Sequence, residues 1–147
     1  GAWSEFYTNY RLIALTAKAR DQGLLEKKHC NWVEKLCQRL DELIPACRPS
    51  LIHGDLWSGN LLIDTSGHPV LIVPAVYYGH PEMDWAMLSL FGSYPVEALD
   101  HYQSLHPLEK GLNERKDIHQ LYPLMVHLIL FGKGYLNGVE STLKKYA

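Results

Sequence analysis

The chain has 147 residues, of which 47% are apolar and 20% are charged, and its formal net charge at pH 7 is -2. This length predicts a single domain over residues 1–147 with a hydrophobic core of its own. The small net charge gives no basic stripe for nucleic acid, and the apolar runs are too short to span a membrane. Neither nucleic acid nor a membrane is an expected partner, and a cytoplasmic location is expected.

The three cysteines and eight histidines show no disulfide or metal-ligand spacing. Cys30, Cys37 and Cys47 contain no Cys-x-x-Cys pair, and the histidines contain no His-Glu-x-x-His pattern. The cysteines are therefore interpreted as small apolar residues, and neither a disulfide nor a structural metal is predicted.

The N-terminal part of the chain predicts two amphipathic helices. The first covers residues 4–22, with Ser4 as its N-cap and Gly23 as the residue that ends it. The second covers residues 26–43 and is ended by the prolines that follow it. The residues of the first helix that are expected to face the core are Phe6, Tyr10, Ile13, Ala14 and Ala17.

A polar octapeptide, His-Gly-Asp-Leu-Trp-Ser-Gly-Asn at residues 53–60, interrupts the apolar middle of the chain. The apolar runs at residues 61–63 and 70–73 are separated by a turn-rich segment, and this pattern predicts a β-hairpin after the polar loop. Because hairpin arms of similar length pair end to end, Val73 is expected to return close to Asn60.

Two residues of the octapeptide, Asp55 and Asn60, have the Asp-x-x-x-x-Asn spacing with which kinase catalytic loops hold a base and a magnesium ligand. Trp57 lies between them, and an indole at this place can stack on a sugar ring or on its attached amine. Packing of Trp57 against a neighbouring helix is the alternative interpretation, and the residues alone leave both open.

Four more helices are predicted after a loop at residues 74–81. They cover residues 83–91, 96–105, 114–131 and 137–146, and the first is apolar enough to be buried on most sides. The sequence therefore predicts a mostly helical α+β fold with one small β-hairpin.

Together these segments resemble the fructosamine (ketosamine) kinases, which belong to the aminoglycoside phosphotransferase-like branch of the protein-kinase-like fold. The resemblance lies in the octapeptide, in Pro74-Ala75, and in the run Tyr-Gly-His-Pro-Glu-Met-Asp at residues 78–84. It extends from Trp3 to the last predicted helix. It implies that the chain is the C-terminal lobe of a protein-kinase-like fold.

The resemblance also implies roles for individual residues. Asp55 matches the catalytic base that accepts the proton of the substrate hydroxyl, and Asn60 matches a ligand of Mg2+. His53 and Asp84 match residues that support the loop, and Trp57 is the candidate substrate-binding residue. ATP is the implied phosphate donor, and a glycated amine or its sugar is the implied substrate.

Two departures from the family pattern lower the expected activity. Val73 occupies the position directly before Pro-Ala where the family carries an aspartate that holds the metal against the ATP phosphates, and valine offers no lone pair. The N-terminal lobe that clamps ATP is also expected to be absent, because no Gly-rich strand pair and no β-sheet lysine precede Trp3. We therefore expect weak binding of Mg2+ and ATP.

Three functions are compatible with the sequence. The first is ATP-dependent phosphorylation of a sugar hydroxyl on glycated amines, by lineage, with this chain itself inactive. The second is a vestigial or truncated pseudokinase-type module for binding or oligomerisation, and a homodimer is expected because the surface facing the missing lobe would be apolar. The third is a metal-dependent hydrolase that uses Asp55, Asp64 and the histidines, and no ligand spacing supports it.

Overall fold

The computed structural model describes residues 1–147, which form a mostly helical structure with four short strands. The residues divide into two compact units, one made of 1–46 with 120–147 and the other of 47–119. The prediction of a single domain stays a prediction. None of the helices combines the length and the apolar character that a membrane crossing requires.

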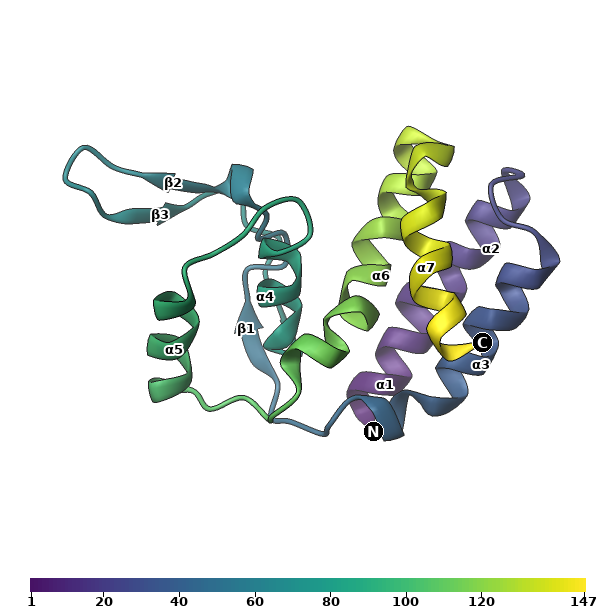
Figure 1. Cartoon of the computed structure of the whole chain (residues 1–147), viewed down its shortest axis with the longest axis horizontal. Coiled ribbons are helices and arrows are strands. Elements are labelled where there is room, and N and C mark those ends of the chain that lie inside the picture. The colour runs from purple at the N-terminus through teal and green to yellow at the C-terminus, as the bar shows by residue number, and fades with distance from the viewer. The chain divides into compact units, whose positions relative to one another are not determined.

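The first unit is built from helices alone. Helix α3 (Lys27–Leu43) contacts both α2 (Ala14–Asp21) and α7 (Leu136–Tyr146), and the three lie side by side (Figure 1). The last part of helix α6 packs here too, since the backbone N–H of Tyr122 donates to the hydroxyl of Tyr7 at 3.3 Å. The helices of this unit are α1 (Ala2–Phe6), α2 (Ala14–Asp21), α3 (Lys27–Leu43), the end of α6 (Leu112–Phe131) and α7 (Leu136–Tyr146).

The first predicted helix contains a π-helical segment, Tyr7–Ile13, that shifts its buried face. Because π-helical hydrogen bonds join residues five apart, Tyr7 and Leu12 both face the core. The stripe predicted from a regular α-helical period is therefore wrong here, and Tyr10 is 69% exposed. Ser4 is not an N-cap either, because it is buried inside helix α1.

A buried histidine joins the start of α3 to α7. The Nδ1 of His29 accepts the backbone N–H of Glu26, the N-cap residue, at 2.8 Å, and its Nε2 lies 2.7 Å from the carboxylate of Glu140. Since Nδ1 accepts, the ring proton is on Nε2 and is donated to Glu140. This contact caps α3 and holds α7 against it.

The second unit contains all four strands and the whole candidate site. Its strands pair as two separate antiparallel sheets, β1 with β4 and β2 with β3. The elements are β1 (Ser50–Ile52), a 3-10 turn (Ser58–Asn60), β2 (Leu61–Ile63), β3 (Pro69–Leu71), β4 (Tyr77–Gly79), α4 (Glu82–Leu88), α5 (Val96–Leu105) and the start of α6.

The predicted hairpin is confirmed, although its second strand ends earlier than expected. Leu61 pairs with Leu71 and Ile63 pairs with Pro69, so the strands form a ribbon that extends away from α4 (Figure 1). The turn is held by the carboxylate of Asp64, which accepts backbone N–H groups of the turn at 2.8 Å. The Asp64 carboxylate is therefore engaged in the hairpin turn, which gives no support to its expected role in a hydrolase site.

The second sheet was not predicted, because residues 74–81 were expected to form a loop. Strand β1 pairs with β4 so that Ser50 faces Gly79 and Ile52 faces Tyr77. Each strand has three residues and its partner is distant in the sequence, so neither carries a local hairpin signal. The pairing matters for the site because β1 leads into the octapeptide and β4 leads into α4.

Helix α4 is shorter than the predicted apolar helix at residues 83–91. It ends at Leu88, and Phe91 beyond it is 42% exposed. Met83 and Ala86 are buried as expected. Helix α5 matches its predicted bounds.

Candidate active site

The octapeptide begins as a loop that Asp84 holds at its start. The carboxylate of Asp84, in the first turn of α4, accepts the backbone N–H of His53 at 2.7 Å and that of Gly54 at 3.0 Å. Burial raises the pKa of Asp84, and the two N–H donors oppose that rise. Asp84 therefore accepts hydrogen bonds from the start of the loop, which is the arrangement that the resemblance implies for it.

His53 connects the loop to the chain that returns from the hairpin. Its Nε2 lies 2.9 Å from the backbone oxygen of Ile72, and its own backbone oxygen accepts the N–H of Ala75 at 2.8 Å. Nδ1 accepts the N–H of Asp55 at 3.3 Å, so the proton is on Nε2 and is donated to Ile72. His53 thus fixes the backbone on both sides of Val73.

Asp55 and Asn60 are brought together as their spacing predicts. The side-chain amide of buried Asn60 donates to the backbone oxygen of Asp55 at 2.8 Å and to its carboxylate at 3.3 Å. The backbone of Asn60 is also held, because its oxygen accepts the N–H of Ile72 at 3.0 Å. This orientation leaves Oδ1 of Asn60 as the atom available to a ligand.

Val73 has an unusual backbone conformation. The backbone N–H of Ile72, the residue before Val73, donates to Asn60, so the returning chain comes back beside Asn60 as expected. Val73 has φ of 52° and is 66% exposed. A β-branched residue is strained in this left-handed region, where glycine, asparagine and aspartate are tolerated better. The two hydrogen bonds of His53 keep the strained segment in place.

These residues do not fit the Mg2+ site that the family implies. Mg2+ requires a near-octahedral set of oxygen ligands and is bound through carboxylates. The chain offers the carboxylate of Asp55, which already accepts the Asn60 amide, and the neutral Oδ1 of Asn60. The side chain of Val73 adds no oxygen, so we derive no chemical step through a metal.

Trp57 packs within its own loop. It is 41% exposed, and its ring lies against the backbone of Gly59. Its backbone N–H donates to Asp55 at 3.1 Å, and its backbone oxygen accepts the N–H of Asn60 at 2.9 Å. The indole is therefore mounted on the same turn that carries the candidate base.

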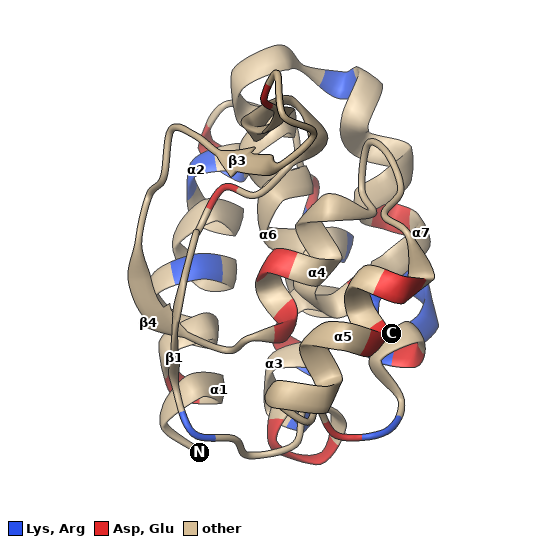
Figure 2. Ribbon diagram, turned by 90° about the vertical axis from the view of Figure 1, so that its left-hand side faces the viewer, with Lys and Arg blue, Asp and Glu red and all other residues tan.

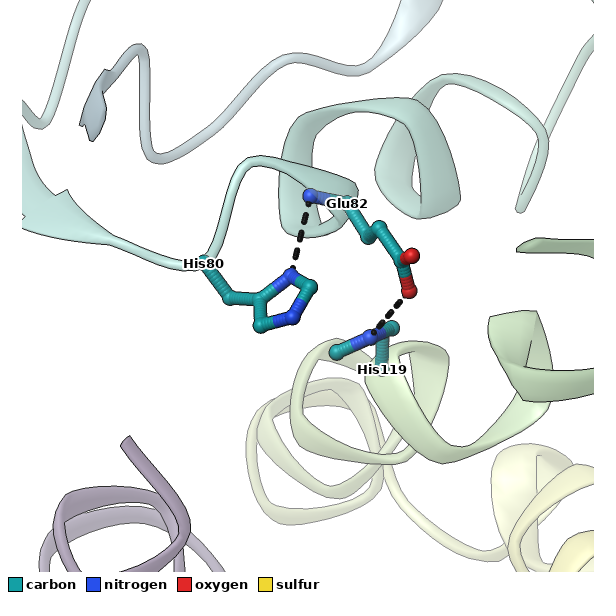
Figure 3. A group of neighbouring side chains, drawn as sticks. All are labelled: His80, Glu82 and His119. Carbon is teal, nitrogen blue, oxygen red and sulfur yellow. Dashed lines mark hydrogen bonds and ion pairs between the residues drawn. The ribbon is translucent and has the colours of Figure 1, made fainter. Parts of the chain in front are cut away.

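A second cluster of ionisable groups, His80, Glu82 and His119, is buried beside the start of α4 (Figure 3). His119 Nε2 lies 3.0 Å from the carboxylate of Glu82, and Nδ1 of His80 accepts the Glu82 backbone N–H at 3.3 Å. Their possible ligand atoms lie within 4.8 Å of one another, which is a feature of metal sites.

Arg115 explains this cluster without a metal. Its Nε donates to one carboxylate oxygen of Glu82 at 3.1 Å and its Nη2 donates to the other, so both oxygens are engaged by a guanidinium. The same guanidinium donates to the backbone oxygens of Glu109 and Lys110 at 2.9 and 2.6 Å. The cluster is an ion-pair network that ties α4 to the start of α6.

The network also controls the ionisation of Glu82. Burial raises its pKa, but hydrogen bonds from His119 and Arg115 outweigh burial and lower the pKa to about 2. Sequence reasoning missed this network because Glu82 and Arg115 are distant in the chain and match no spacing motif. That the chain binds no structural metal stays a prediction.

The chain has a mostly helical α+β fold, and its structure is similar to that of a solved fructosamine kinase. The family model described as fructosamine kinase matches residues 1–147, and the chain belongs to that family. The predicted fold class and the resemblance are thereby confirmed.

The similar proteins are about twice as long as this chain. A probable ketoamine kinase of Enterococcus faecium is 51% identical over 148 residues, and one of Lactiplantibacillus plantarum is 42% identical over 146 residues. Each alignment covers 98% of this chain but only 53% and 52% of those proteins. A crystal structure from Thermobifida fusca, described as a fructosamine-3-kinase, has a TM-score of 0.89 and 40% identity, covering 97% of this chain and 50% of that one.

Proposed function

We propose that this chain is the lobe of a ketosamine kinase that carries the catalytic base, Asp55, and the substrate-binding residue Trp57. We also propose that residues 1–147 alone do not transfer phosphate. The proposal is supported by the contrast between the ordered loop at residues 55–60 and the apolar side chain of Val73. The loop from Asp55 to Asn60 has its hydrogen bonds in place, while Val73 offers an apolar side chain where the family binds metal.

Asp55 would accept the proton of a sugar hydroxyl, because its carboxylate is half-buried and is oriented by the amide of Asn60. His53 and Asp84 would hold the loop at its start. ATP and Mg2+ are the implied donor and cofactor, and they would supply the phosphoryl group and neutralise its charge. The names of the similar ketoamine kinases support a glycated amine as the substrate class.

Phosphoryl transfer depends on positioning and charge neutralisation, and two of its requirements are unmet within residues 1–147. One is a second metal ligand beside Asn60, because the side chain of Val73 cannot coordinate a metal. The other is a phosphate-covering loop with a lysine that aligns the γ-phosphate. Loss of either leaves the transition state without its main electrostatic stabilisation.

Replacing Val73 with aspartate tests the proposal. We expect Val73→Asp to raise stability by about 1 kcal/mol, because aspartate tolerates the left-handed conformation better than valine. The added carboxylate should also tighten Mg2+ binding by about tenfold or more, with little gain in phosphate transfer. Calorimetry with Mg2+-ATP and a transfer assay with fructosyl-lysine measure both effects.

Val73→Asn is the matched control, because it relieves the same strain without adding a charge. It should match the stability gain of Val73→Asp but not its Mg2+ affinity. Tight nucleotide binding or turnover by residues 1–147 unmodified would refute the proposal, since neither Val73 nor the lack of a phosphate-covering loop within these residues would then limit activity.

The second candidate function, a binding or oligomerisation module, is favoured by the exposed β2–β3 ribbon. A two-stranded ribbon is marginal in water by itself, and its unpaired edges can pair with another chain. Figure 2 shows β3 without a charged residue. The large exposed apolar residues of the ribbon are Leu62, Ile63, Val70 and Leu71.

We expect the chain to form a homodimer through this ribbon. Sedimentation at roughly tens of micromolar, where micromolar contacts are populated, should give twice the 16.8 kDa chain mass. Ile63→Lys with Leu71→Lys should return the chain to a monomer, because charges on exposed strands block edge pairing. A monomer for the unmodified chain under these conditions would rule the dimer out.

A further inference from the structure

Gly59 is a glycine that its backbone conformation does not require. It lies in the 3-10 turn Ser58–Asn60, outside the left-handed region that favours glycine. A Cβ at this position would lie 2.2, 2.4 and 2.6 Å from three ring carbons of Trp57, which are its nearest neighbours. Contacts this short are sterically forbidden, so the indole can keep this position only while residue 59 has no side chain.

The turn that holds the Trp57 indole is hydrogen-bonded to Asp55, the candidate base. The backbone of Trp57 is bonded to Asp55 on one side and to Asn60 on the other, at 3.1 and 2.9 Å. One part of the ring is against Gly59, and the residue keeps 41% of its surface exposed. An alanine at 59 would force the ring into another rotamer and remove it from this place.

We propose that Gly59 is a positioning residue that seats the Trp57 indole as a flat platform for the sugar ring or the adjoining ammonium of a glycated amine. A π-face of this kind packs on the C–H groups of a sugar and attracts an ammonium group. The inference rests on the proposed function, since it names the residue that holds the substrate platform beside Asp55. Gly59 acts through Trp57 and does not itself contact the substrate.

Gly59→Ala tests the seat, with Gly134→Ala as the matched control. Gly134 also lies in a 3-10 turn, Lys133–Tyr135, and an added Cβ there meets no atom within 4 Å. The indole N–H signal of Trp57, assigned in an NMR spectrum by its loss in Trp57→Phe, should shift in Gly59→Ala and stay in Gly134→Ala. An unchanged signal in Gly59→Ala would overturn the inference and leave the kinase proposal intact.

Titration with fructosyl-lysine tests the platform itself. The Trp57 signal of the unmodified chain should shift to saturation, and the dissociation constant should rise at least about tenfold in Gly59→Ala. An equal affinity in Gly59→Ala would contradict the platform role. If the unmodified chain binds no fructosyl-lysine, the substrate class of the proposed function is wrong. The Gly59→Ala spectrum tests only the position of the indole, so the two failures can be told apart.

A double variant covers the case in which Gly59→Ala does not fold. Combined with Trp57→Ala, the substitution removes the ring that the new methyl group would meet. The loss of melting temperature caused by Gly59→Ala should then be largely abolished. An equal loss in both backgrounds would show that Trp57 is not what requires the glycine.

Discussion

Replacing Arg115 with methionine should lower the free energy of unfolding by about 3–5 kcal/mol, because it leaves a buried carboxylate without its cation. Glu82 is fully buried, and Arg115 engages both of its oxygens. The substitution also frees the backbone oxygens of Glu109 and Lys110. Urea unfolding of the two proteins, followed by circular dichroism, measures the loss.

The double variant Arg115→Met with Glu82→Met provides the control. Replacing both members of a buried ion pair by apolar side chains is much less costly than removing one. The double variant should therefore recover a large part of the lost stability. Additive losses from the two single substitutions would contradict the account of the cluster as a coupled ion pair.

The same network predicts how stability depends on pH. Glu82 has a pKa of about 2 in the folded chain, below its ordinary value of 4.5, so the ionised carboxylate stabilises the fold. Its contribution, about 3 kcal/mol, should be fully present above pH 4.5 and be lost as the pH falls toward 2. This part of the acid dependence should be reduced in Arg115→Met, because the guanidinium is one of its causes.

Gly54→Ala should be the most damaging glycine substitution in the loop. Gly54 has φ of 85°, and a Cβ there would lie 2.1 Å from the backbone oxygen of Ala75. That oxygen cannot move freely, because the N–H of Ala75 is bonded to His53 at 2.8 Å. The methyl group would therefore separate the loop from the chain that follows Val73.

Gly67→Ala separates the two reasons for this loss. Gly67 has nearly the same φ, 84°, but an added Cβ meets nothing within 4 Å. We expect Gly67→Ala to cost about 1–2 kcal/mol from backbone strain alone. Gly54→Ala should cost about 2 kcal/mol more, as overpacking adds to the strain. Equal losses in denaturant unfolding would show that the close approach to Ala75 is unimportant.

The sequence predicted those parts of the fold whose signal is local. The hairpin follows from two apolar runs around a turn held by Asp64, and α5 follows from a regular helical stripe. The contact between Asp55 and Asn60 was predicted from their five-residue separation in one loop. Each of these depends on residues that are close in the sequence.

The features that were missed depend on contacts between distant segments or on an irregular period. Strands β1 and β4 pair across the whole octapeptide and hairpin, and the link from Glu82 to Arg115 joins two helices. The π-helical segment changes the repeat from which the first buried stripe was predicted. The role of Gly59 needed the position of the Trp57 ring, which no spacing rule supplies.

We have proposed that this chain retains the catalytic base of a kinase site, Asp55, and lacks a complete set of metal ligands. The most direct measurement is the paramagnetic broadening of the Asn60 side-chain amide signals by Mn2+-ATP, in the unmodified chain and in Val73→Asp. We predict selective, saturable broadening in Val73→Asp and none in the unmodified chain. Selective broadening of Asn60 in the unmodified chain would contradict this proposal, because the set of metal ligands would then be complete without an acid at position 73.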